Sequence, residues 1–95
     1  TAYPSKISNA GCKERSRLTY YEKTAESYIL SKNFIIAEKY IENALYYAEK
    51  FNLEYRKARN LFLKANIAME NGELALAQQT YLSANVIFIK NNILI

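Results

Sequence analysis

The chain has 95 residues and a net charge of +4, with no histidine, a single cysteine and only two glycines. These counts exclude an internal disulfide, a histidine-based metal or catalytic centre and a glycine-rich phosphate loop. A hydrophobic fraction of 51% with 23% charged residues is ordinary for one small globular domain, and no run of 18 apolar residues is present to span a bilayer. We therefore expect no enzyme, no cofactor, no metal and no membrane span.

Residues 1–12 have the composition of a loop, with the only proline, Pro4, and Gly11 among serines and asparagine. We expect a flexible leader there. Ala10-Gly11-Cys12 resembles the end of a bacterial lipoprotein signal, but no apolar run precedes it. The expected location is therefore the cytoplasm, and the alternative is the cell envelope if Cys12 marks a lipoprotein start. Because the first residue is Thr1 and not Met, we expect a processed or excised part of a longer protein.

A first helix is predicted from about residue 13 to residue 32. Leu18, Tyr21, Ala25 and Tyr28 recur at spacings of three and four residues, which places them on one face of a helix. The segment 31–33 interrupts the pattern, and it ends in an asparagine, a residue that tolerates the left-handed conformation. We expect a turn at this point.

A second helix is predicted from about residue 34 to residue 51, and it has two apolar sides. Ala37 and Ala44 lie on one side, and Tyr40 and Tyr47 lie on the other. A helix that is apolar on two sides needs two neighbours. This pattern favours a stack of helices over an isolated helical hairpin.

A third helix, from about residue 54 to residue 70, is followed by a cap at Asn71-Gly72 and by a fourth helix from about residue 73 to residue 90. The third helix carries a cluster of cations, which we expect to be a solvated face, since charge runs on helices usually are. The alternative is a nucleic-acid stripe, which we do not favour. The apolar stripe expected to be buried comprises Ala58, Leu61, Phe62, Ala65, Ala68 and Met69, and the cations are Arg56, Lys57, Arg59 and Lys64.

The second half of the chain repeats the first half at an offset of forty residues. Ala77 falls on Ala37, and Tyr81 falls on Ile41. Self-similarity at this period is typical of stacked repeats. We therefore predict an all-α fold of four antiparallel helices in two stacked helix-turn-helix repeats, residues 13–52 and 53–92, with residues 93–95 as a tail at the start of a third repeat.

The pattern of small and large residues resembles the tetratricopeptide repeat family, over about residues 18–90. Three features depart from the common form: a period of forty residues against about 34, Ala68 in place of an aromatic residue, and no proline after the second helices. Such long repeats are similar to those of peptide-sensing regulators in Gram-positive bacteria. The matching positions are Tyr21, Ala25, Tyr28, Ala37, Ile41 and Ala44 in the first repeat, and Leu61, Ala65, Ala77, Tyr81 and Ala84 in the second.

The resemblance implies a concave groove lined by the first helix of each repeat, which binds a peptide or helix of a partner protein. The implied function is that of a scaffold or adaptor. The alternative is a fragment of a bacterial peptide-sensing regulator whose output domain lies outside this chain. The implied groove residues are Thr19, Glu22, Glu26, Ile29, Arg59, Phe62, Asn66 and Met69.

Two of these groups have a simpler interpretation. Ile29, Phe62 and Met69 are equally well explained as core residues, because apolar stripes at this spacing are often buried. Glu22 and Glu26 are expected to be solvated glutamates that do not act as an acid–base pair. Their negative charge argues against binding of the carboxylate end of a chaperone tail.

The fourth helix is apolar around most of its circumference. Large exposed apolar patches usually mark interfaces, and terminal repeats of a stack need a polar outer face. We therefore expect Leu82, Val86 and Ile89 to be covered, either by a second copy in a homodimer or by further repeats.

Overall fold

The computed structural model describes the backbone of residues 5–91 and the side chains of residues 15–91. It contains four helices: α1 (Ser5–Leu30), α2 (Phe34–Lys50), α3 (Glu54–Glu70) and α4 (Leu74–Lys90). Within the described backbone there is no β-strand. The predicted all-α fold is confirmed. None of the described helices is both long enough and apolar enough to cross a membrane.

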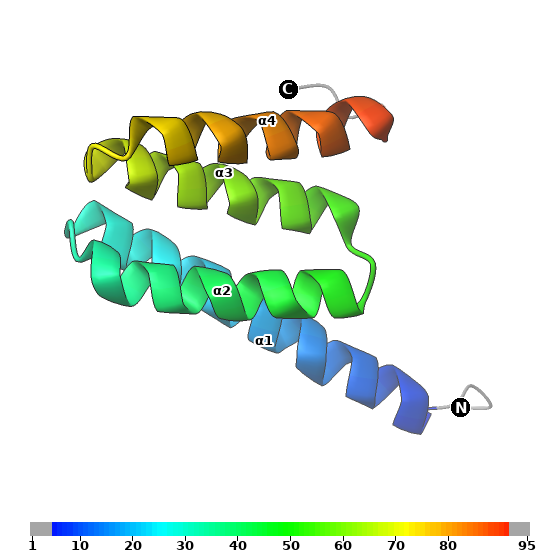
Figure 1. Cartoon of the computed structure of the whole chain (residues 1–95). Coiled ribbons are helices and arrows are strands. Elements are labelled where there is room, and N and C mark those ends of the chain that lie inside the picture. Colours follow the sequence, from blue (N-terminus) through cyan, green and yellow to red (C-terminus); the bar gives the residue numbers. More distant parts are fainter. Residues whose placement is uncertain (1–4, 92–95) are drawn as a thin grey trace.

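The four helices form two hairpins that stack on each other (Figure 1). α1 packs against α2, and α3 packs against α4, while contacts between α2 and α3 join the two hairpins. The order of the helices in space therefore follows the order in the sequence. This is the arrangement that the forty-residue offset predicts.

The expected start of the first helix is wrong. α1 begins at Ser5 and therefore includes most of the segment that was expected to be a loop. Proline restricts the backbone conformation of itself and of the residue before it, so the residues after Pro4 are free to be helical. One glycine inside a helix lowers its stability by only about 1 kcal/mol. Residues 1–4, the tail at 93–95 and the side chain of Cys12 lie outside the described residues. The remaining helix ends agree with expectation to within two residues, and those of α3 agree at both ends.

The three turns share one geometry, at intervals of twenty residues. Lys32, Asn52 and Gly72 have φ values of 63°, 54° and 79°, respectively. In each turn the backbone N–H of this residue donates to the carbonyl three residues earlier, and the next N–H donates to the carbonyl five residues earlier. This double hydrogen bond is the Schellman motif. The left-handed residue of the first turn is Lys32, whereas Asn33, which was expected to fill that role, has a φ of −93°.

The core contains the small residues at the positions that the repeat pattern predicts. Large side chains fill the spaces between them, and Ile67 is buried with Ala25, Ala37 and Ile41, where it joins the two hairpins. Small residues on facing helices allow the axes to approach closely. The alanines that are at most 1% exposed include Ala25, Ala37, Ala44, Ala65, Ala77 and Ala84.

Candidate functional site

Arg56 on α3 and Glu22 on α1 form the most buried ion pair of the described structure. The guanidinium Nε lies 3.1 Å from both carboxylate oxygens of Glu22, and Nη2 lies 2.6 Å from Oε1. The same Nη2 donates to Thr19 Oγ1 at 3.1 Å. Because Glu22 is only 4% exposed, its carboxylate charge is stabilised by these bidentate hydrogen bonds in place of water. The hydrogen bond with Glu22 raises the pKa of Arg56 despite the opposing effect of burial, so the guanidinium stays charged.

Asn60 is a second donor to the same carboxylate, one helical turn after Arg56. Its Nδ2 donates to Glu22 Oε2 at 2.7 Å and to the Arg56 carbonyl at 2.8 Å. The residue is fully buried, and its Oδ1 has no hydrogen-bond partner among the described atoms. The sequence interpretation missed Asn60. The available signal was a polar residue four positions after an arginine, hence on the same face of the helix.

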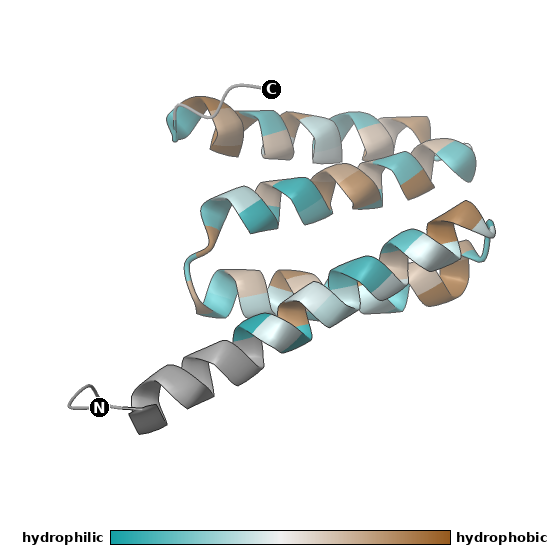
Figure 2. Cartoon of the chain, turned by 180° about the vertical axis from the view of Figure 1, so that it is seen from behind, coloured by the Kyte–Doolittle hydropathy of each residue, from teal (hydrophilic) through white to brown (hydrophobic). Residues whose placement is uncertain are grey.

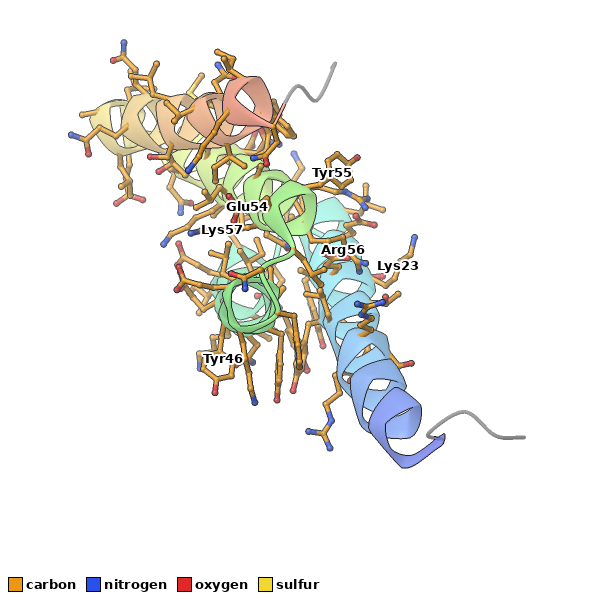
Figure 3. All side chains as sticks on the ribbon, turned by 90° about the vertical axis from the view of Figure 1, so that its right-hand side faces the viewer. Lys23, Tyr46, Glu54, Tyr55, Arg56 and Lys57 are labelled. Carbon is orange, nitrogen blue, oxygen red and sulfur yellow. The ribbon has the colours of Figure 1, made fainter. Side chains whose placement is uncertain are left out.

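The other cations of α3 are also paired with the first hairpin. Figure 3 shows Arg56 and Lys57 leaving α3 on different sides, toward α1 and α2 respectively. The expectation of a solvated face is wrong, because α3 lies against both helices of the first hairpin and each cation meets a glutamate. The nucleic-acid stripe loses its support for the same reason. The remaining pairs are Arg59–Glu26 at 2.8 Å, Lys57–Glu49 at 3.0 Å and Lys64–Glu42 at 2.8 Å.

This pairing closes one half of the expected groove. Thr19, Glu22, Glu26 and Arg59 lie together, but their polar groups serve the contact between α1 and α3. The expectation of a solvated carboxylate is therefore wrong for Glu22, and Glu26 is half-buried in its own ion pair. These residues hold the two hairpins together. Their charges are already neutralised by one another.

The other half of the groove is open, at the end of the seam where α1 and α3 finish. Here Ile29, Asn66 and Met69 line a pocket of about 350 Å³. Figure 2 shows the hydrophobic end of the first hairpin beside the end of α3. Met69 is 50% exposed, so the interpretation of this residue as core is wrong. The remaining lining residues are Leu30, Lys32, Phe34 and Glu70.

Asn66 is held in place by α4. Its Oδ1 accepts a hydrogen bond from the Tyr81 hydroxyl. The acceptor end of the amide is therefore occupied, and the amide N–H groups remain as donors. Phe62 lies apart from the pocket, with its ring in edge contact with Tyr81 at 5.0 Å between centroids. It is 39% exposed, so the interpretation as a buried core residue is wrong for Phe62 as well.

The pocket offers apolar surface, one amide donor and one charge of each sign. Among the described side chains, no group of three or more histidine, cysteine, aspartate or glutamate residues is placed to hold a metal ion. The lining of the pocket suits recognition of an apolar group next to a polar one.

Comparisons with known proteins do not assign the chain to a family. No family model matches it, and no curated protein and no solved structure matches it significantly. The resemblance to tetratricopeptide repeats therefore rests on the residue pattern.

Proposed function

We propose that this chain is a protein-interaction module of the tetratricopeptide type, which binds a peptide or helix of a partner protein as a scaffold or adaptor. The supporting observation is the open, largely apolar pocket at the ends of α1 and α3, which coincides with part of the groove implied by the resemblance. This role needs binding and no catalysis. A cytoplasmic setting is part of the proposal, because a lone cysteine suits a reducing compartment.

The proposed ligand is a peptide with one apolar anchor side chain. Ile29, Phe34 and Met69 supply apolar surface, and covering it removes that surface from water. The amide of Asn66, oriented by Tyr81, donates to a peptide carbonyl beside the anchor. Lys32 and Glu70 favour charged residues of both signs in the flanking peptide.

Selection of peptides tests this function. Random twelve-residue peptides displayed on phage are selected on the chain, and the recovered peptides are synthesised for fluorescence anisotropy. Met69→Ala should weaken their binding about tenfold, as expected for an anchor contact of more than 1 kcal/mol.

Tyr55→Ala is the matched control. Tyr55 and Met69 lie toward opposite ends of α3 and are 51% and 50% exposed, respectively. Tyr55→Ala should leave peptide affinity unchanged. If the recovered peptides bind both variants equally weakly, or bind both as tightly as the unchanged chain, the pocket is not the binding site.

A further inference from the structure

Met69 is the only methionine of the chain, and it lies in the last turn of α3, where it lines the open pocket. The corresponding residue of the first hairpin, forty positions earlier, is Ile29, which lines the same pocket. Ile29 packs against the buried core, whereas Met69 is 50% exposed. The repeat therefore accommodates an aliphatic side chain at this place, and its packing does not require a thioether.

A thioether at an accessible position is open to oxidation. Unlike a cysteine, it needs no lowered pKa, because the reacting electron pair on its sulfur is present at every pH. A lone pair of the Met69 sulfur attacks one oxygen of hydrogen peroxide, the O–O bond breaks, a sulfur–oxygen bond forms and water leaves. The sulfur loses two electrons and the peroxide gains them. The product is methionine sulfoxide, in which a flexible apolar side chain has become polar.

The sulfoxide changes both features on which the proposed peptide contact depends. It places a polar S–O group beside Ile29 and Phe34, where the apolar anchor is proposed to bind. It also adds a hydrogen-bond acceptor three residues after Asn66 on the same helix, and both residues line the pocket. The amide N–H groups of Asn66 are the donors proposed for the peptide, because its Oδ1 already accepts from Tyr81. A hydrogen bond from Asn66 to the sulfoxide takes one of these donors away from the ligand.

The fold around Met69 does not depend on the thioether. The backbone carbonyl of Met69 accepts the turn hydrogen bond from Gly72, and oxidation of the side chain leaves that bond in place. Because the side chain is half exposed, the new oxygen can be hydrated by solvent. We therefore expect the oxidised chain to remain folded.

We propose that Met69 is a reversible oxidation site whose oxidation turns off peptide binding at the pocket. This inference rests on the proposed function and adds its regulation. The oxidant is a peroxide. A methionine sulfoxide reductase reverses the step, in which two thiols are oxidised to a disulfide and the sulfoxide oxygen leaves as water.

Oxidation with hydrogen peroxide, followed by peptide mapping in a mass spectrometer, tests the reactivity of the site. The Cys12→Ser chain is used throughout, so that Met69 is the only sulfur-containing residue. Met69 should gain one oxygen atom at a rate comparable with that of methionine in a short unstructured peptide in the same solution. Circular dichroism should show unchanged helix content. Protection of Met69 from peroxide, or unfolding of the oxidised chain, would overturn the proposal.

Fluorescence anisotropy with the phage-selected peptides tests the effect on binding. Oxidation should weaken their binding about tenfold, the loss expected when an anchor contact is removed, and reductase treatment should restore it. Met69→Leu is the matched control, because leucine is apolar and of similar size but has no sulfur to oxidise. This variant should bind the peptides as the unchanged chain does and keep its affinity after peroxide. Full affinity of the oxidised chain, or the same loss in the Met69→Leu variant, would overturn the oxidation site.

Failure of the proposed function gives a different result. A selection that yields no peptide sensitive to Met69→Ala refutes the function and this inference together. Peptides that are sensitive to Met69→Ala but not to oxidation refute the inference alone. NMR of the side-chain amide of Asn66 gives a reading without any ligand: its signals should shift on oxidation of Met69 and stay in place when the Met69→Leu variant is treated. Unshifted signals would refute the hydrogen bond to the sulfoxide.

Discussion

Glu22 and Arg56 join α1 to α3, although these helices pack against each other far less extensively than successive helices do. The two residues are 34 positions apart, and their pairing brings the cationic side of α3 to the first hairpin. A buried ion pair of this kind is not by itself evidence of high stability, since both charges lose water. Removing one partner is nevertheless costly, because the other is left without compensation.

Glu22→Ala should therefore lower the free energy of unfolding by about 2 to 3 kcal/mol. Breaking a fully buried pair costs about 3 to 5 kcal/mol. We expect less here because the Arg56 side chain keeps 29% of its exposure. The control is Glu49→Ala, because the Glu49 side chain is 70% exposed in its pair with Lys57. It should cost about 1 kcal/mol or less. Urea unfolding measures both, and equal losses would contradict the special role of Glu22.

Ala65→Leu or Ala77→Leu should destabilise the chain by about 1 to 3 kcal/mol through overpacking. Both alanines are at most 1% exposed, at the close approach of neighbouring helices. Ala75→Leu adds the same atoms at an exposed position of α4 and should cost little. Thermal unfolding distinguishes the three variants. An unchanged melting temperature for Ala65→Leu would show that the helices do not approach at this residue.

Lys32→Gly should stabilise the chain by about 0.5 kcal/mol. Lys32 has a φ of 63°, and the left-handed conformation costs a side-chain-bearing residue roughly 1 to 2 kcal/mol, partly offset by the greater chain entropy of glycine when unfolded. Gly72 already fills the equivalent place in the third turn. Ser31→Gly, one position earlier and without a positive φ, should destabilise instead. Urea unfolding measures the stability of both variants. A change in the same direction for Lys32→Gly and Ser31→Gly would contradict this explanation.

Tyr40 should ionise above its ordinary pKa of 10.0, mainly because the charge of an ionised Tyr20 and the hydrogen bond with its hydroxyl raise the pKa. The two ring centroids are 6.3 Å apart. A raised folded-state pKa contributes stability that is fully present below the unfolded pKa and is lost as the pH rises through the folded value. Tyr20→Phe should return the pKa of Tyr40 toward 10.0.

NMR titration of tyrosine labelled at the ring carbon bearing the hydroxyl measures this pKa directly. Tyr55→Phe, on α3 and in contact with Phe88, is the control and should leave the Tyr40 titration unchanged. An identical Tyr40 titration with and without the Tyr20 hydroxyl would remove Tyr20 as the cause.

The sequence by itself determined the four helices, the forty-residue repeat and the buried alanines. Each of these depends on local spacing, because the 3.6-residue period decides which residues share a face and small residues mark close contacts. The turn at Gly72 was predictable for a similar reason, since glycine adopts a positive φ without steric cost. The same reasoning predicted the left-handed conformation of the first turn for Asn33, whereas Lys32 adopts it. There the hydrogen-bonding pattern, and not the residue type, sets the conformation.

Only the tertiary structure decided what the polar residues do. Read along the chain, Glu22 belongs to one helix and Arg56 and Asn60 to another, and a solvated position is the ordinary outcome for such polar residues. Stacking of the hairpins brings them within hydrogen-bonding distance and buries the carboxylate. The same stacking divides the implied groove into a closed ionic half and an open pocket at Met69. The direction and pairing of a long polar side chain depend on the neighbour that it meets, and this information is absent from local spacing.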